Sequence, residues 1–208
     1  MKLPREKDIM KQPEKKSQPA RVFAAAFAAV LMAAAASCIQ SLQPLFEDKD
    51  LIFDSRFLGV WTDSQGQDSW SFERGREKEY RLVCRSADDE ETARFVGRLG
   101  RLGGALFLDI FPEDKGNPRP RNEMLVLHLL PVHTLWRVRF EGEGLCLESM
   151  DPDWLKEQID AGRAKIGHVR SGDRLVLTAD TAALQAFFAG QAANDKAFPR
   201  SDSPLKRK

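Results

Sequence analysis

Residues 69–149 alternate between apolar and polar side chains with a period of two, and this pattern constrains the fold more than any other feature of the chain. The alternation covers residues 70–73, 78–85, 92–99, 105–111, 134–141 and 145–149, with Gly- or Pro-containing turns between most runs. Residues 124–130 (MLVLHLL) are the most apolar run, and we interpret them as a further strand. Consecutive strands joined by short turns predict an antiparallel meander that curls toward a barrel or half-barrel.

Two short helices are expected after the meander. Asp151 and Pro152 are good N-cap and first-turn residues for a helix that ends near residue 160. Residues 163–178 then predict a last hairpin, and a second helix places Leu184 and Phe188 on one apolar stripe. The expected fold class is therefore mainly β, with two C-terminal helices.

The N-terminus has the pattern of an export signal. Residues 1–21 hold seven basic and three acidic side chains, and residues 22–37 (VFAAAFAAVLMAAAAS) carry no charge. As a helix this uncharged run is about 24 Å long, which is shorter than the ~30 Å hydrocarbon core of a bilayer. We therefore expect a signal helix within residues 1–37, translated from Met1 or from Met10.

The residues before Cys38 (Ala35-Ala36-Ser37) resemble a bacterial lipobox, although Ala35 stands where a large aliphatic residue is usual. The resemblance implies that Cys38 becomes the N-terminus and carries the lipid, with a diacylglycerol on its thiol and a further acyl chain on its amine. Two or more chains are enough for stable anchoring. The alternatives are an uncleaved anchor helix, or cleavage without acylation. Three further segments are expected: a flexible tether over residues 38–54, a β domain over 55–198 and a disordered tail over 199–208.

The first strand of the folded region carries Leu58-Gly59-Val60-Trp61, a G-x-W motif that resembles the lipocalin barrels. The resemblance implies that Gly59 lets the chain bend and that Trp61 plugs one end of a barrel under a basic side chain. Arg174, on the last expected strand, is the predicted partner, with Arg170 as second choice. The longer pattern, including residues 41–45 and 151–155, resembles uncharacterised bacterial lipoproteins, which brings no activity with it.

Composition and motifs argue against several functions. The chain has 32 basic and 31 acidic residues, so nothing favours nucleic-acid binding. The spacing of its histidines (His128, His133 and His168) matches no metal motif, so no metal or cofactor is predicted. Serine-hydrolase motifs are absent from the sequence, which leaves only a hydrolase of scattered residues. Cys84 and Cys146 form a disulfide in one interpretation and are buried free thiols in the other.

These observations favour a non-enzymatic protein of the bacterial envelope, lipid-anchored to the outer membrane or the periplasmic face. The leading expectation is a small apolar ligand held in a lipocalin-like domain, and Trp70, Phe107, Phe111 and Trp136 are the candidate lining residues. The alternative is an interaction module, an assembly or inhibitor subunit that docks another envelope protein. An enclosed apolar cavity would support the first, and a filled interior with an exposed apolar patch the second.

Overall fold

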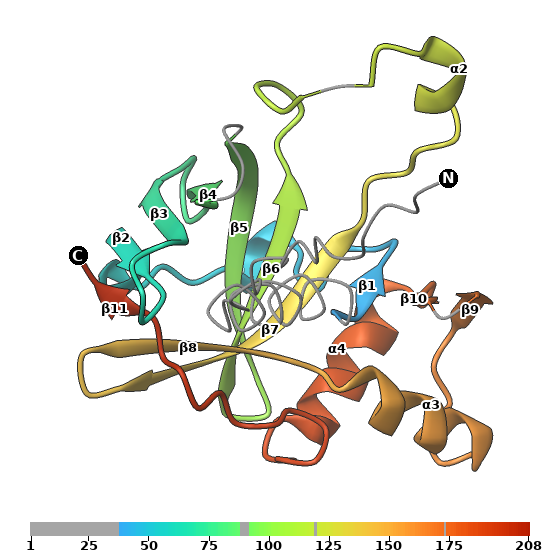
Figure 1. The fold of residues 1–208 in the computed structure, drawn as a ribbon. Helices are drawn as coiled ribbons and strands as arrows, with labels where there is room; N and C mark the ends of the chain where they lie inside the picture. The colour runs from blue at the N-terminus through green and yellow to red at the C-terminus, as the bar shows by residue number, and fades with distance from the viewer. Residues whose placement is uncertain (1–37, 88–91, 119, 173) are drawn as a thin grey trace, which may run out of the picture. The chain divides into compact units, whose positions relative to one another are not determined.

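The computed structural model describes residues 38–87, 92–118, 120–172 and 174–208, and the expected signal helix lies outside them. The described part is mainly β (Figure 1). Its strands are β1 (Gln40–Ser41), β2 (Gly59–Thr62), β3 (Ser69–Arg74), β4 (Tyr80–Arg85), β5 (Ala93–Leu102), β6 (Ala105–Pro112), β7 (His133–Glu141), β8 (Gly144–Ser149), β9 (His168–Ser171), β10 (Arg174–Leu177) and β11 (Lys206–Arg207). Its helices are α2 (Glu123–Val126), α3 (Pro152–Asp160) and α4 (Thr181–Gln191), with short 3₁₀ turns η1 (Asp48–Asp50) and η2 (Ser55–Phe57).

The strands form one open, mostly antiparallel sheet in the order β11-β2-β3-β4-β5-β6-β7-β1-β10-β9, with β8 paired to β7. The strands β2 to β8 pair antiparallel in chain order, which confirms the predicted meander apart from the strand expected at residues 124–130. Among the strands of the described residues, only β1 and β10 pair in parallel. The expected hairpin after the first helix is β9–β10.

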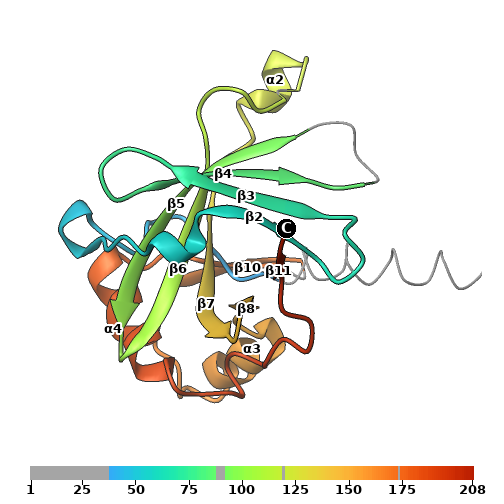
Figure 2. The same cartoon turned by 90° about the vertical axis from the view of Figure 1, so that its left-hand side faces the viewer.

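The sheet separates two hydrophobic cores, and β6 shows how. Leu106 and Leu108 on one of its faces join a core that we call the aromatic core, which contains Phe57, Trp61, Phe72 and Tyr80. Because neighbouring strand residues point to opposite faces, Phe107 joins the other core, with Phe188 of α4 and Phe198. We call this second core the helix-side core, since α3 and α4 both contribute to it (Figure 2).

The two C-terminal helices lie where the sequence predicts them. Asp151 caps α3 by accepting hydrogen bonds from the backbone N–H groups of Asp153 and Trp154, and Pro152 is in its first turn. Asp180 caps α4 in the same way through Ala183 N–H. Leu184 and Phe188 are the buried residues of α4, as the apolar stripe predicts.

The expected flexible tether over residues 38–54 is wrong, because this stretch belongs to the fold. Ile39, Leu45, Phe46 and Leu51 are all buried in the helix-side core. Phe46 lies against Gly100 of β5, where an added Cβ would overlap its ring. These apolar residues are scattered among polar ones without a period, so their pattern predicts no helix or strand.

The expected disordered tail over residues 199–208 is also wrong. Leu205 exchanges backbone hydrogen bonds with Leu145 of β8, and β11 pairs with β2. Lys208 N–H adds a bond to Val60 O. Residues 192–208, which we call the C-terminal strap, therefore bind the strands at both ends of the β2–β8 meander.

Residues 124–130, predicted to be the most apolar strand, form no strand and are exposed. They form the short helix α2 and the turn after it, within the long connection between β6 and β7. In both views α2 stands away from the sheet (Figures 1 and 2). The strand interpretation failed because an unbroken apolar run has no face of its own, so its pattern does not distinguish a central strand from a projecting turn.

Candidate interaction surface

Trp61 has a cationic partner, but it is Arg207 of the C-terminal strap and not the predicted Arg174. The Arg207 guanidinium lies 4.4 Å from the centroid of the Trp61 ring. It also donates to the backbone oxygens of Arg56 and Leu58, which end the η2 turn. Arg174 is exposed on β10 and pairs in register with Ser171 of β9.

Gly59 explains how the arginine reaches the indole. Its φ of +121° is a conformation that favours glycine, and a Cβ there would lie 2.7 Å from Nη1 of Arg207. Trp61 Nε1 donates to Phe57 O at 2.7 Å, which fixes the ring from the other side. The G-x-W motif thus has the geometry that its resemblance implies, with a different basic residue.

The four candidate lining residues do not converge on one cavity. Trp70 and Trp136 meet edge to face, with ring centroids 6.2 Å apart, at the border of the aromatic core. Phe107 is buried on the opposite face of the sheet, which contradicts its predicted lining role. Phe111 is half-buried at the end of β6, where its ring packs on His133.

The aromatic core is filled by its own side chains. Phe57 contacts the rings of Phe72, Tyr80 and Phe140 at centroid separations of 5.3–5.4 Å. Trp61, Phe72 and Tyr80 are each at most 1% exposed. The phenol of Tyr80 accepts from Asp54 N–H and donates to Asp54 O, so its polar end is satisfied as well. The rings of this core therefore pack against one another, and the polar ends of Trp61 and Tyr80 have partners within the protein.

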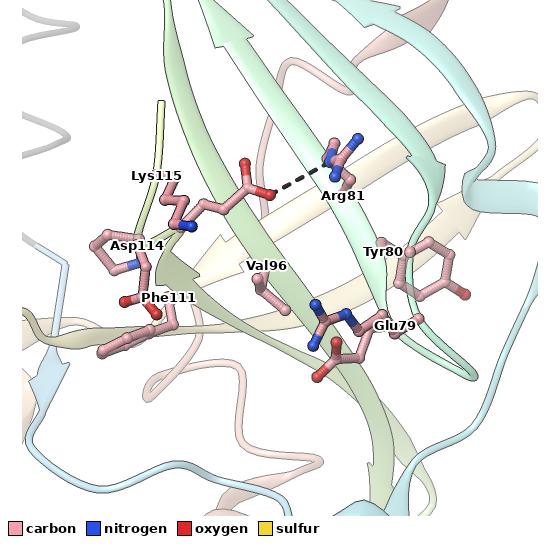
Figure 3. A pocket seen from close by; sticks show the side chains of 11 residues that line it. Glu79, Tyr80, Arg81, Val96, Phe111, Asp114 and Lys115 are labelled. Carbon is pink, nitrogen blue, oxygen red and sulfur yellow. Dashed lines mark ion pairs between the residues drawn. The ribbon is translucent and has the colours of Figure 1, made fainter. Parts of the chain in front are cut away.

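One pocket of about 380 Å³ lies on the outside of β4, β5 and β6 (Figure 3). Charged side chains dominate its lining, including Arg76, Glu79, Arg81 and Lys115. Arg81 forms an ion pair with Glu113 across it at 3.4 Å. Because these charges neutralise one another within the pocket, it presents neither an apolar site nor a site of one sign.

A serine, a histidine and an aspartate do come together in the sheet, without forming a catalytic set. Asp109 accepts from Nδ1 of His133 at 2.7 Å, and Ser41 lies opposite His133 in the β1–β7 pair. The Ser41 hydroxyl, however, donates to Gln43 O at 2.8 Å. Ser41 and Asp109 are 0% and 1% exposed, so no substrate reaches them. Asp109 also accepts from Leu45 N–H, which ties the N-terminal stretch to the sheet.

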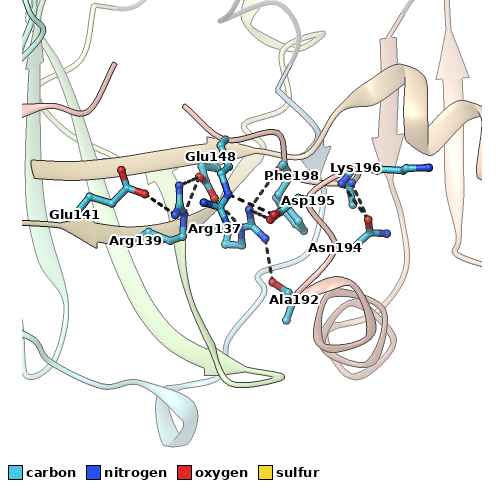
Figure 4. A network of polar contacts seen from close by, with 11 residues as sticks. Arg137, Arg139, Glu141, Glu148, Ala192, Asn194, Asp195, Lys196 and Phe198 are labelled. Carbon is cyan, nitrogen blue, oxygen red and sulfur yellow. Dashed lines mark hydrogen bonds and ion pairs between the residues drawn. The ribbon is translucent and has the colours of Figure 1, made fainter. Parts of the chain in front are cut away.

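The largest buried ionic cluster is also structural (Figure 4). Arg137 of β7 is 3% exposed and donates to Glu148 of β8, which is 2% exposed. The same guanidinium donates to the backbone oxygens of Ala192 and Phe198 and to the Asp195 carboxylate. All its contacts beyond Glu148 are therefore to the C-terminal strap, which it fastens to the sheet.

Cys84 and Cys146 are free thiols, the second of the two alternatives left open by the sequence. Burial raises the pKa of Cys84 to about 12 and also raises that of Cys146, so neither is activated as a thiolate. Cys38 is half-buried beside Ser149, and burial raises its pKa to about 11. Among the described residues, no group of three or more metal-ligating side chains is clustered.

The surface feature that stands out is residues 124–130, which we call the apolar segment. Six of the seven large hydrophobic side chains exposed in the described ranges belong to it, and Val169 of β9 is the other. Leu127, Leu130 and Met124 are 77%, 69% and 65% exposed. This surface was not predicted, although Asn122, a good N-cap residue, and Pro131 bracket the run and favour a short helix over a strand.

Comparisons with known proteins give no further assignment, since no family model matches the chain and no curated protein or solved structure is detectably similar to it. In the part of the chain that the structure describes, no helix has the length and apolarity needed to cross a membrane.

Proposed function

We propose that this chain is a lipid-anchored, non-enzymatic protein of the bacterial envelope that acts through its surface and carries no ligand in its interior. The observation that carries the proposal is the pairing of a filled aromatic core with a concentrated apolar exposure at residues 124–130. Exposed apolar patches of this kind are characteristic of interaction surfaces. An apolar-ligand carrier needs an enclosed cavity instead, and Phe57, Trp61 and Phe72 fill the position it would take.

The strap supports a finer proposal for the fold, a lipocalin-like barrel formed by β2 to β8 and closed by the C-terminus. Leu205 hydrogen-bonds to β8, and the next two residues pair with β2, so one short segment bonds to both end strands of the meander. The Gly59, Trp61 and Arg207 arrangement lies at this junction. Closure removes exposed strand edges, which suits a domain that is rigid and filled.

The proposed membrane localisation rests on the uncharged run before Cys38 and on the lipobox-like residues that end it. Because Ile39 is 1% exposed, the acylated residue would adjoin the folded body directly, with no spacer. The domain would then lie against the membrane surface. The lipid would leave the protein beside Ser149 of β8, the hydrogen-bond partner of Cys38.

Intact-protein mass spectrometry of the full chain, expressed in a bacterium and extracted from membranes, tests the proposal. The expected product begins at Cys38 and carries a diacylglyceryl group and an amide-linked acyl chain. Cys38→Ser is the matched control and should lack both. Full-length, unmodified protein in the soluble fraction would refute the proposed lipid anchoring. An apolar molecule recovered at one equivalent per chain by solvent extraction would refute the ligand-free interior.

A further inference from the structure

We propose that the apolar segment inserts into the hydrocarbon boundary of the bilayer and gives the domain a second membrane contact beside the expected lipid on Cys38. This inference rests on the proposed membrane address and names the partner of the exposed surface as a phospholipid bilayer. An apolar helix lying at an interface is buried by about 5–10 Å. The apolar segment, residues 124–130, is long enough to reach that depth and too short to span the bilayer.

The distribution of its side chains favours a fluid partner. Every residue from 121 to 131 is exposed, and the large apolar side chains of the segment point to all sides of the short helix and turn. A docked protein covers one face of a helix, and such helices carry a single apolar stripe. A helical turn that is apolar all round is suited to immersion, and hydrocarbon chains surround a projecting group on every side.

The backbone N–H groups of residues 125–129 all have hydrogen-bond partners within the segment or just before it. The amides of Val126 and Leu127 bond to the carbonyls of Asn122 and Glu123. Those of His128 and Leu129 bond in the same way within the turn, and Leu125 N–H bonds to the Asn122 side chain. The only polar side chain of the segment, His128, uses Nδ1 to donate to Met124 O at 2.7 Å. Backbone groups without internal partners are what hydrocarbon excludes, and five consecutive N–H groups here have such partners.

The position of the segment in the chain agrees with a membrane partner. Arg121, three residues before the segment, is exposed and would lie near anionic headgroups once the apolar residues enter. The segment returns to the sheet at His133, which pairs with Ser41, three residues after Cys38. Cys38 itself lies beside Ser149, which pairs with Trp136, so roughly 10 Å of β7 separates the expected lipid from the residue at which the segment returns to the sheet.

The base of the connection is held rigidly. The ring centroids of Phe111 and His133, at the two ends of the β6–β7 connection, lie 4.4 Å apart. His133 also forms a hydrogen bond with Asp109. Farther out, the Asn117 side chain bonds to both backbone groups of Arg94 and to Glu113 O. A fixed base presents the segment in one direction and reduces the ordering cost of insertion.

Lipid photolabelling of the protein as it is extracted from bacterial membranes tests this inference. The chain is reconstituted in vesicles of phosphatidylethanolamine and phosphatidylglycerol (3:1) that contain a phospholipid with a diazirine in its acyl chain. After illumination, labelled peptides are mapped by mass spectrometry. We expect label on residues 123–130 and none on the β9–β10 hairpin, whose exposed Val169 is the internal control. Leu127→Asn with Leu129→Asn should reduce the label at least about tenfold, since burial of one aliphatic side chain contributes that much or more. Val169→Asn should leave it unchanged.

The outcomes separate the two proposals. Acylation at Cys38 with no label on the apolar segment would overturn the proposed insertion and leave the proposed lipid anchor standing. Crosslinks from the segment to another protein, or to a second copy of the chain, would then identify that molecule as the partner of the segment. A labelled segment without acylation supports the insertion and overturns the lipid anchor. Circular dichroism of the double variant should match the parent, because the substituted side chains are exposed and carry none of the hydrogen bonds that hold the segment.

Discussion

The apolar segment is exposed and the C-terminal strap is bound to the sheet, which is the opposite of what their compositions indicate. Residues 124–130 are almost entirely aliphatic and lie outside the fold, whereas residues 199–208 (PRSDSPLKRK) are almost entirely polar and are fixed to two strands. The strap gains its place through backbone pairing and through arginines at its contacts, Arg137 from the sheet and Arg207 of its own. In the apolar segment the N–H groups of residues 125–129 bond locally, without the help of a neighbouring strand.

The comparison shows that burial depends on available partners as much as on hydrophobicity. A polar segment is ordered when its backbone finds an open strand edge, and the cost of ordering it is offset by those bonds. An apolar run can stay outside when the cores are closely packed without it, and Phe107 and Phe72 are 0% and 1% exposed in the two cores. Each half of this comparison predicts how variants should behave.

The strongest test of the strap is the buried pair of Arg137 and Glu148. Glu148→Ala leaves the guanidinium buried without its main carboxylate, and we expect the free energy of unfolding to fall by about 3–5 kcal/mol in urea titration. Glu141→Ala is the matched control, because Glu141 is a half-exposed partner of Arg139 and should change stability by no more than about 0.5 kcal/mol. Equal losses in the two variants would mean that the pair does not hold the strap.

A smaller effect is expected at Trp61. Arg207→Ala removes a guanidinium stacked on the indole, and because Arg207 is exposed we expect a loss of about 1 kcal/mol, with raised proteolysis of the C-terminus. Arg174→Ala, the partner chosen from the sequence, should cost nothing measurable. The idea that Arg207 closes the end of the meander would be abandoned if the two alanine variants showed the reverse order in thermal unfolding.

Features set by neighbouring residues were predictable from the sequence. The hairpins from β3 to β8, without the long β6–β7 connection, follow from period-two runs and turn residues, and α3 and α4 follow from Asp151 and Asp180 at their caps. The stacking of an arginine on Trp61 followed from the resemblance carried by Gly59 and Trp61. The identity of that arginine did not, because the strap returns to β2 from more than 140 positions away and no local pattern records the contact.

The burial of residues 38–54 and the sheet face on which Phe107 lies were harder to predict from the sequence, for the same reason. Ile39 and Phe46 are buried by partners on β5, α4 and β10, which a single sequence does not reveal. The candidate lining residues Phe107 and Trp136 were grouped because both are aromatic and both lie in the meander. Their alternation positions place Phe107 on the helix side of the sheet, so correct strands did not guarantee a correct choice of face.

The smallest expected effect concerns the apolar segment and completes the comparison. Leu127 is 77% exposed, so Leu127→Ala should change the free energy of unfolding by no more than about 0.5 kcal/mol, and heat denaturation of the detergent-solubilised chain measures it. Leu108→Ala makes the same change at a fully buried position of β6 and should cost about 2–5 kcal/mol. A large loss at Leu127 would mean that the segment packs on the domain. The apolar segment would then be part of the core, as its composition indicates. If Leu127→Ala leaves the free energy of unfolding unchanged, the hydrophobicity of the segment serves something other than folding.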